Sequence, residues 1–227
     1  MGQETAEHSG HRARLRKRLL DGGGEALLEH ELLEYLLALA LPRRDTKPLA
    51  KRLIARFGSY AAVVSASPEE LAGAGELTEG LIAAIKIAQA SALRLLKAGV
   101  DKRPVLASWQ ALLDYLHADL AHRQTEAVRL LLLNARNVLI RDEVVSEGSV
   151  DQAAVYAREI IRRALEHHAS ALILVHNHPS GDPKPSRDDI QMTRTILDAA
   201  RLLGIAVHDH VIIGRSGHAS FKSLGLL

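Results

Sequence analysis

The chain has 227 residues, with 29 basic and 27 acidic side chains, twelve histidines and no cysteine. This length predicts one large domain or two small ones. Because cysteine is absent, disulfides, a thiolate nucleophile and cysteine-ligated metals are excluded, and any metal must be held by His, Asp or Glu. The near balance of charge argues against a strongly cationic surface. An aromatic content of 3% leaves few rings for stacking single-stranded bases.

The sequence predicts a cytoplasmic protein with no membrane partner. Its first residues lack the basic stretch and apolar run of a secretory signal peptide. The longest apolar runs, such as residues 169–175, fall far short of the ~20 residues that a membrane-spanning helix needs.

The first half of the sequence predicts helices only. Leucines recur at helical spacing between residues 27 and 37, and Pro42 ends that pattern. Three more helical segments follow: residues 48–57, a segment that begins at Ser67 and Pro68, and residues 77–97.

A short polar segment at residues 99–104, bounded by Gly and Pro, predicts a linker. Residues 1–98 before it form an all-α domain, and residues 105–227 after it form an α/β domain. In this second domain the predicted helices are 109–120, 157–167 and 186–203, and the predicted strands are 128–133, 138–145, 169–175 and 205–213.

The residues that carry chemistry are His-Asn-His-Pro-Ser-Gly-Asp-Pro-Lys-Pro-Ser-Arg-Asp-Asp, at 176–189. They begin where a buried strand ends, a usual place for site residues in α/β sheets. Side chains two apart in a strand share a face, so His176 and His178 offer two imidazoles to one metal. Asp189, at the third position of the next helix, can point its carboxylate toward them. Two His and one Asp leave one tetrahedral position for water, which is the ligand set of a catalytic zinc site.

Each part of this segment also has a simpler explanation. A lone His-x-His is more often surface or core than metal-binding, and Ser186 with Asp189 fits an N-terminal helix cap that alone would explain both residues. The combination of a strand end, a turn and a helix start favours a metal site, because burying imidazoles and a carboxylate together is costly.

The same residues carry a family resemblance. His176-x-His178, seven residues, then Ser186-x-x-Asp189 matches the JAMM motif of the MPN/JAB metallopeptidase superfamily. The longer run from His176, with the later Leu-Gly-Ile and Asp-His at 203–205 and 209–210, resembles the bacterial RadC family (UPF0758). The resemblance extends over nearly the whole chain. It implies an MPN/JAB-like α/β domain, with a mixed sheet flanked by helices, preceded by a helix-hairpin-helix-like domain.

The resemblance also implies roles for these residues. His176, His178 and Asp189 would be the ligands of a Zn²⁺ ion. Ser186 would support the oxyanion of a tetrahedral intermediate.

The superfamily uses an upstream Glu as general base. Glu126 is favoured here because it directly precedes an apolar strand, as the superfamily Glu precedes its own. Glu147 is the rival and Glu143 a more distant one. The simpler alternative for Glu126 is a solvated residue at a helix–strand junction.

A second His-x-His spans residues 208–210, without an acidic residue at helix-start spacing. Ordinary packing is its simplest explanation. The alternative is that Asp209 or His210 lies beside the first site and orients a ligand imidazole.

The leading hypothesis is a zinc-dependent hydrolase, a metallopeptidase that cleaves a peptide or isopeptide bond of a peptide or protein substrate. The rival is a DNA-associated protein, with DNA bound by residues 1–98 and a metal site that acts on nucleic acid or is structural. The basic run at residues 11–18 and the loop at 72–82, which resembles a helix-hairpin-helix loop, favour the rival. Glu76 and Glu79 beside that loop would repel phosphate. A non-catalytic interaction module ranks last, because the ligands are intact.

Overall fold

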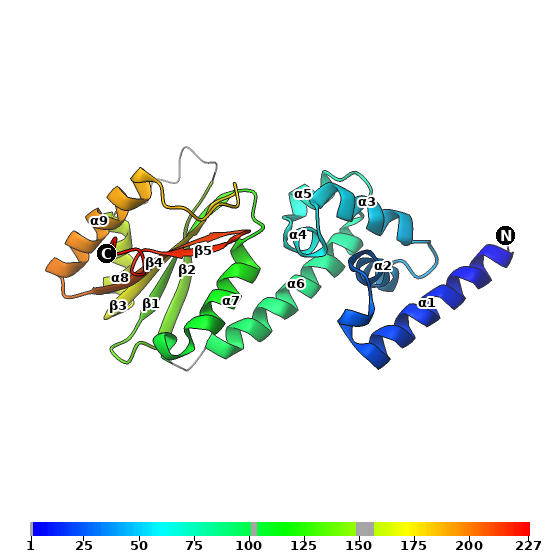
Figure 1. The fold of residues 1–227 in the computed structure, drawn as a ribbon, viewed down its shortest axis with the longest axis horizontal. Helices are drawn as coiled ribbons and strands as arrows, with labels where there is room; N and C mark the ends of the chain where they lie inside the picture. Colours follow the sequence, from blue (N-terminus) through cyan, green and yellow to red (C-terminus); the bar gives the residue numbers. More distant parts are fainter. Residues whose placement is uncertain (1, 101–103, 149–156) are drawn as a thin grey trace. The chain divides into compact units, whose positions relative to one another are not determined.

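The computed structural model describes residues 2–100, 104–148 and 157–227, with side chains described from residue 10 onward. The chain divides into two compact units, Met1–Ala92 and Leu93–Leu227. The first is helical in its described residues, and the second contains a five-stranded sheet with helices on both faces (Figure 1). The α/β class predicted for the second half is confirmed.

The first unit is built from helices that pack leucines into a common core. Leu33, Leu37 and Leu53 are buried there. Ser67 caps its helix as predicted, since its Oγ accepts from the Glu70 amide at 3.2 Å and the Glu70 carboxylate accepts from the Ser67 amide at 2.7 Å. The helices are α1 (Gly2–Gly22), α2 (Glu29–Ala40), α3 (Lys47–Phe57), α4 (Tyr60–Ser65), α5 (Pro68–Ala72) and α6 (Glu79–Val100), with a 3₁₀ turn at Gly24–Ala26. No helix in the described part of the chain is long and apolar enough to cross a membrane.

The predicted linker begins too early. Helix α6 continues through Gly99 and Val100, and Val100 is fully buried against the core of the second unit. That burial holds the end of the helix in place despite the glycine. Residues 101–103 lie outside the described residues, and Pro104 already forms a β-bridge with Val138.

The sheet of the second unit is mixed, as predicted. Its strand order is β2-β1-β3-β4-β5, in which only the β3–β4 pair is parallel. The strands are β1 (Glu126–Leu133), β2 (Leu139–Gly148), β3 (Ala171–Asn177), β4 (Ala206–Gly214) and β5 (Gly217–Ser220). Strand β5 was not predicted, because a four-residue strand that begins with glycine carries too little pattern to be identified.

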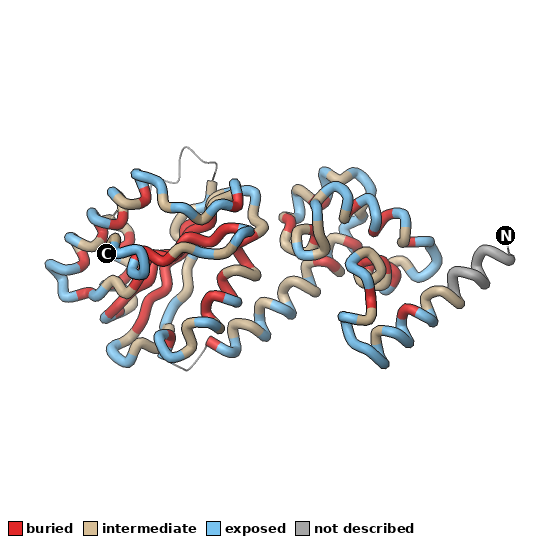
Figure 2. Tube along the Cα trace, in the orientation of Figure 1, coloured by how far each residue is buried: buried red, intermediate tan, exposed pale blue. Residues whose placement is uncertain are grey.

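Helices cover the two faces of this sheet with separate cores. Odd-numbered residues of β1 and β3, such as Leu131 and Ile173, pack on α7 (Trp109–Leu120), which follows a 3₁₀ turn at Val105–Ser108. Even-numbered residues, such as Leu130 and Leu174, pack on α8 (Ala157–Glu166) and α9 (Arg187–Leu202). All seven residues of β3 are consequently buried, as are most of β1 and β4 (Figure 2).

The α7 face also buries a charged cluster. Arg129 of β1, only 7% exposed, pairs with Asp119 of α7 and with Asp142 of β2, and its guanidinium also donates to Tyr115 Oη at 2.8 Å. Each buried carboxylate therefore has a counter-charge. Burial, chiefly, raises the pKa of Tyr115 to about 12.

Removing the positive charge from this cluster should be strongly destabilising. Arg129→Leu leaves Asp119 and Asp142 buried without their main partner, so we expect the free energy of unfolding to fall by about 3–5 kcal/mol. Arg141→Leu removes a half-exposed partner of Glu143 and should cost less than about 1 kcal/mol. Urea titrations of both variants measure this difference, and equal midpoints would contradict the role of the cluster.

Candidate metal centre

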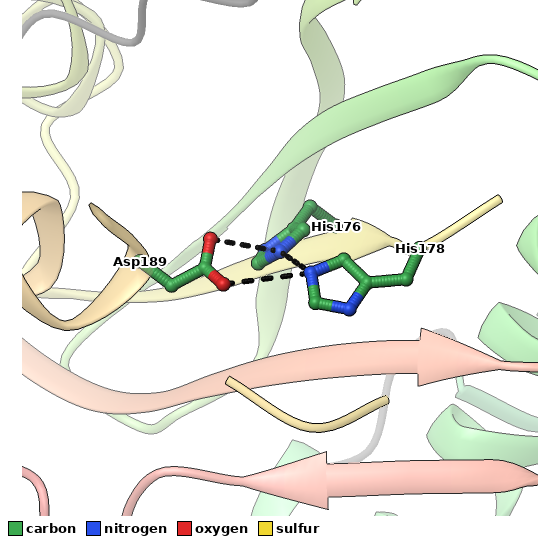
Figure 3. Close-up of side chains that lie close together, drawn as sticks. All are labelled: His176, His178 and Asp189. Atoms are coloured by element: carbon green, nitrogen blue, oxygen red, sulfur yellow. Dashed lines mark hydrogen bonds and ion pairs between the residues drawn. The ribbon is translucent and has the colours of Figure 1, made fainter. Parts of the chain in front are cut away.

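The three predicted metal ligands meet at one point, at the carboxyl end of β3 (Figure 3). His176 lies near the end of β3, His178 is the first residue beyond it, and Asp189 is the third residue of α9. His176 Nε2 lies 3.0 Å from His178 Nε2 and 3.2 Å from Asp189 Oδ1, and His178 Nε2 lies 3.4 Å from Asp189 Oδ2. Among the described residues, this is the only group with the ligand types and spacing of a metal site.

These distances fit a tetrahedral zinc site. Zinc bonds of about 2.0–2.2 Å to nitrogen and oxygen place ligand atoms about 3.3–3.6 Å apart. The observed separations of 3.0 to 3.4 Å lie close to this range, and the two to Asp189 go to different oxygens of its carboxylate. With one ligand atom per residue, the three atoms lie within 4.8 Å of one another. The donor set, two imidazole nitrogens and a carboxylate, also suits zinc.

Helix capping and ligand geometry coexist in Asp189. Its Oδ2 accepts from the amide and from the hydroxyl of Ser186, both at 2.7 Å, while Ser186 Oγ accepts from the Asp189 amide at 3.1 Å. Oδ2 also lies 3.4 Å from His178 Nε2, and the other oxygen, Oδ1, takes no part in the cap and faces His176. The cap therefore does not compete with the site, because it fixes the carboxylate that the site uses.

The charges within the cluster favour an ionised carboxylate. Burial alone would raise the pKa of Asp189, but the close contacts with the His176 and His178 imidazoles outweigh it and hold that pKa well below its usual range. The contact with Asp189, chiefly, raises the pKa of His178, and the negative charge of Glu126 adds to this effect. The cluster thus attracts positive charge.

The loop after β3 sets the orientation of His178. Its Nδ1 lies 2.8 Å from the carbonyl oxygen of Asp182, so Nδ1–H donates there and Nε2 is left to face the cluster. Gly181, at φ 92°, packs so closely on Gly214 that a Cβ at Gly214 would collide with the Gly181 carbonyl. The two glycines let the loop lie flat on the end of β4.

Asn177 fixes the residues on either side of the predicted base. Its Oδ1 accepts from the Ala127 amide at 2.9 Å and its Nδ2 donates to the Thr125 carbonyl at 3.1 Å. Glu126 lies between these two anchors. Asn177 had no predicted role, although its place between two predicted ligands was a signal.

The sheet register separates the three candidate glutamates. Val128 of β1 is paired with His176 of β3, so these two side chains lie on the same face of the sheet. Glu126 is two residues before Val128 in the same strand and therefore lies on that face too. Glu147 is opposite Ala127, on the α7 face, where it pairs with Arg123 at 2.9 Å. Glu143 contacts Arg163, Arg141 and His167, away from the cluster.

Two further buried residues, His210 and Thr193, continue the hydrogen bonds from His176. His210 Nε2 lies 2.8 Å from His176 Nδ1, and His210 Nδ1 lies 2.6 Å from Thr193 Oγ1. Packing alone, the simplest explanation of the second His-x-His, therefore does not account for His210. Asp209 instead accepts from Ser220 Oγ at 2.5 Å and from the Lys222 amide at 3.0 Å.

The chain is similar to known proteins of one family. Residues 106–226 match the family model described as "RadC-like JAB domain". A protein of Rhodobacter capsulatus named "UPF0758 protein" is 53% identical over 94% of this chain and 100% of its own length. A UPF0758 protein of Ruegeria pomeroyi is 51% identical over 96% of this chain and 97% of its own length. From the match to its JAB domain and the extent of this identity, the chain belongs to the RadC (UPF0758) family.

Proposed function

We propose that this protein is a zinc-dependent hydrolase of JAMM type that cleaves a peptide or isopeptide bond. The observation that carries the proposal is the convergence of His176, His178 and Asp189, with ligand atoms all within 4.8 Å of one another. The RadC-like JAB domain is consistent with a metal-dependent hydrolase.

The surrounding residues supply the other parts of such a reaction. A zinc ion bound there would activate water at neutral pH by lowering its pKa toward ~7. Glu126, on the same face as His176, would take the proton and return it to the leaving amine. Ser186 would donate its hydroxyl to the developing oxyanion by turning it away from Asp189 Oδ2.

The purified protein should contain about one zinc per chain, bound through this cluster. His178→Ala removes one of three protein ligands, so we expect zinc to be lost on dialysis. Elemental analysis by mass spectrometry measures the metal content. His208→Ala is the matched control, since His208 belongs to the other His-x-His and contacts Asn137. A folded wild type that takes up no zinc would overturn the proposal.

Changing the base should separate catalysis from metal binding. Glu126→Gln keeps the size of the side chain but cannot take a proton, so we expect zinc content to be unchanged and cleavage to slow by about 10²–10⁴-fold. Cleavage is measured by mass spectrometry on a library of peptides and isopeptide-linked peptides. Glu147→Gln, on the opposite face, should cleave like the wild type. The reverse result would assign the base to Glu147.

DNA binding by residues 1–98 is a second candidate, and one contact favours it. Glu76 is paired with Arg52 through two hydrogen bonds, which offsets the repulsion that Glu76 would exert on a phosphate at the start of α6. The basic run of α1 is partly used within the protein, because Arg12 donates to backbone carbonyls after α2 and Arg18 pairs with Glu31.

The three basic residues of this run that are left on the surface should then contact phosphate. They are Arg14, Arg16 and Lys17. If they do, replacing all three with Ala weakens binding of duplex DNA and reduces the salt slope of log K by up to about three. Fluorescence anisotropy with the full chain measures both. The control replaces three exposed basic residues of the second unit, Arg194, Arg201 and Lys222. No wild-type binding at low salt would exclude this candidate.

A further inference from the structure

A line of hydrogen bonds connects Asp189 to His176, two of the proposed metal ligands, through Thr193 and His210. It runs from the Asp189 carbonyl to Thr193 Oγ1 (2.6 Å), on to His210 Nδ1 (2.6 Å), and from His210 Nε2 to His176 Nδ1 (2.8 Å). Thr193 and His210 are fully buried, and His176 is 1% exposed. Each group in this line must therefore find its partner within the line.

The direction of this line is fixed by its first member. A backbone carbonyl only accepts, and two oxygens 2.6 Å apart need a proton between them, so the Thr193 hydroxyl donates to the Asp189 carbonyl. Thr193 Oγ1 can then only accept from His210, whose proton is on Nδ1. His210 Nε2 is left as an acceptor, and His176 donates to it from Nδ1.

This direction leaves the lone pair of His176 Nε2 facing His178 and Asp189. The opposite direction would place a proton on that nitrogen, which could not then bind a metal. His178 has the same tautomer, with Nε2 free, because its Nδ1–H donates directly to the Asp182 carbonyl.

A β-bulge turns His210 toward this line. Leu172 pairs with Val207, but the next residue, Ile173, pairs with Asp209, so β4 contains one extra residue at His208. Without the bulge, His210 would be opposite Val175 and would point to the α7 face. Phe221 then stacks on the His210 ring, with 4.4 Å between the ring centroids. The ring is thus held in place.

We propose that Thr193 and His210 are positioning residues that hold His176 in the tautomer with Nε2 free for a metal. The inference rests on the proposed metal site but not on the reaction or its substrate. Partners of this kind commonly contribute about 10–100-fold to metal affinity.

The test uses the full chain and three changes in α9. Thr193→Val removes the hydroxyl with little change in shape, and Thr193→Ser keeps it. Thr195→Val is the matched control, because Thr195 is exposed and makes the same type of bond, to the Gln191 carbonyl four residues back. Zinc affinity is measured by competition with a chromophoric chelator. The tautomers of His176 and His210 are measured in the zinc-free protein by long-range ¹H–¹⁵N NMR of the rings.

In the wild type and in the Ser and Thr195 variants, we expect protons on Nδ1 of both rings and the same zinc affinity. Thr193→Val should lose this single tautomer and bind zinc about 10–100-fold more weakly. Unchanged tautomers and affinity in Thr193→Val would overturn the inference, as would Nε2–H on His176 in the wild type. If the wild type binds no zinc, the proposed function fails, while the ring tautomers still decide whether Thr193 and His210 act as inferred.

Discussion

The burial of β3 on both faces is the constraint on which the second unit depends. Its seven residues lie between β1 and β4 and under helices on both sides, so water cannot satisfy polar groups there. The strand nevertheless ends with His176 and Asn177, both 1% exposed. Each must be paired by protein, and their partners account for much of the surrounding structure. Asn177 fixes the start of β1, and His176 requires His210.

Buried charged groups are paired differently on the two faces of the sheet. On the α7 face, Arg129 supplies the positive charge that Asp119 and Asp142 need, so that cluster is complete without a ligand. On the α9 face, three atoms with lone pairs, two imidazole Nε2 and a carboxylate oxygen, converge with the ring Nδ1 atoms directed to other partners. Convergence of acceptors without a donor is unfavourable unless a cation lies among them. This asymmetry supports the proposal that the α9 face holds a metal site, whereas the α7 face holds a buried ion pair.

Local patterns in the sequence predicted much of the fold and the convergence of the ligands. His176, His178 and Asp189 are close in sequence, on a strand end and a helix start, so periodicity was sufficient to bring them together. Periodicity could not decide between packing and a place beside the site for His210, because its side chain faces α9 only through a bulge in β4. Thr193 gave no signal, since a threonine within a helix is ordinary. The linker was predicted to start too early for a similar reason. Gly99 is typical of a helix end, but the burial of Val100, a tertiary contact, lets the helix continue through it.

The stacking of Phe221 on His210 also affects when the centre can form during synthesis. The ring of His210 and the side chain that covers it both belong to the last strands and turns of the chain, whereas His176, His178 and Asp189 emerge from the ribosome earlier. A nascent chain that has reached only α9 already contains the three ligands but neither His210 nor Phe221. The positioning of His176 proposed above would therefore be completed only late in translation, after the three ligands have been made.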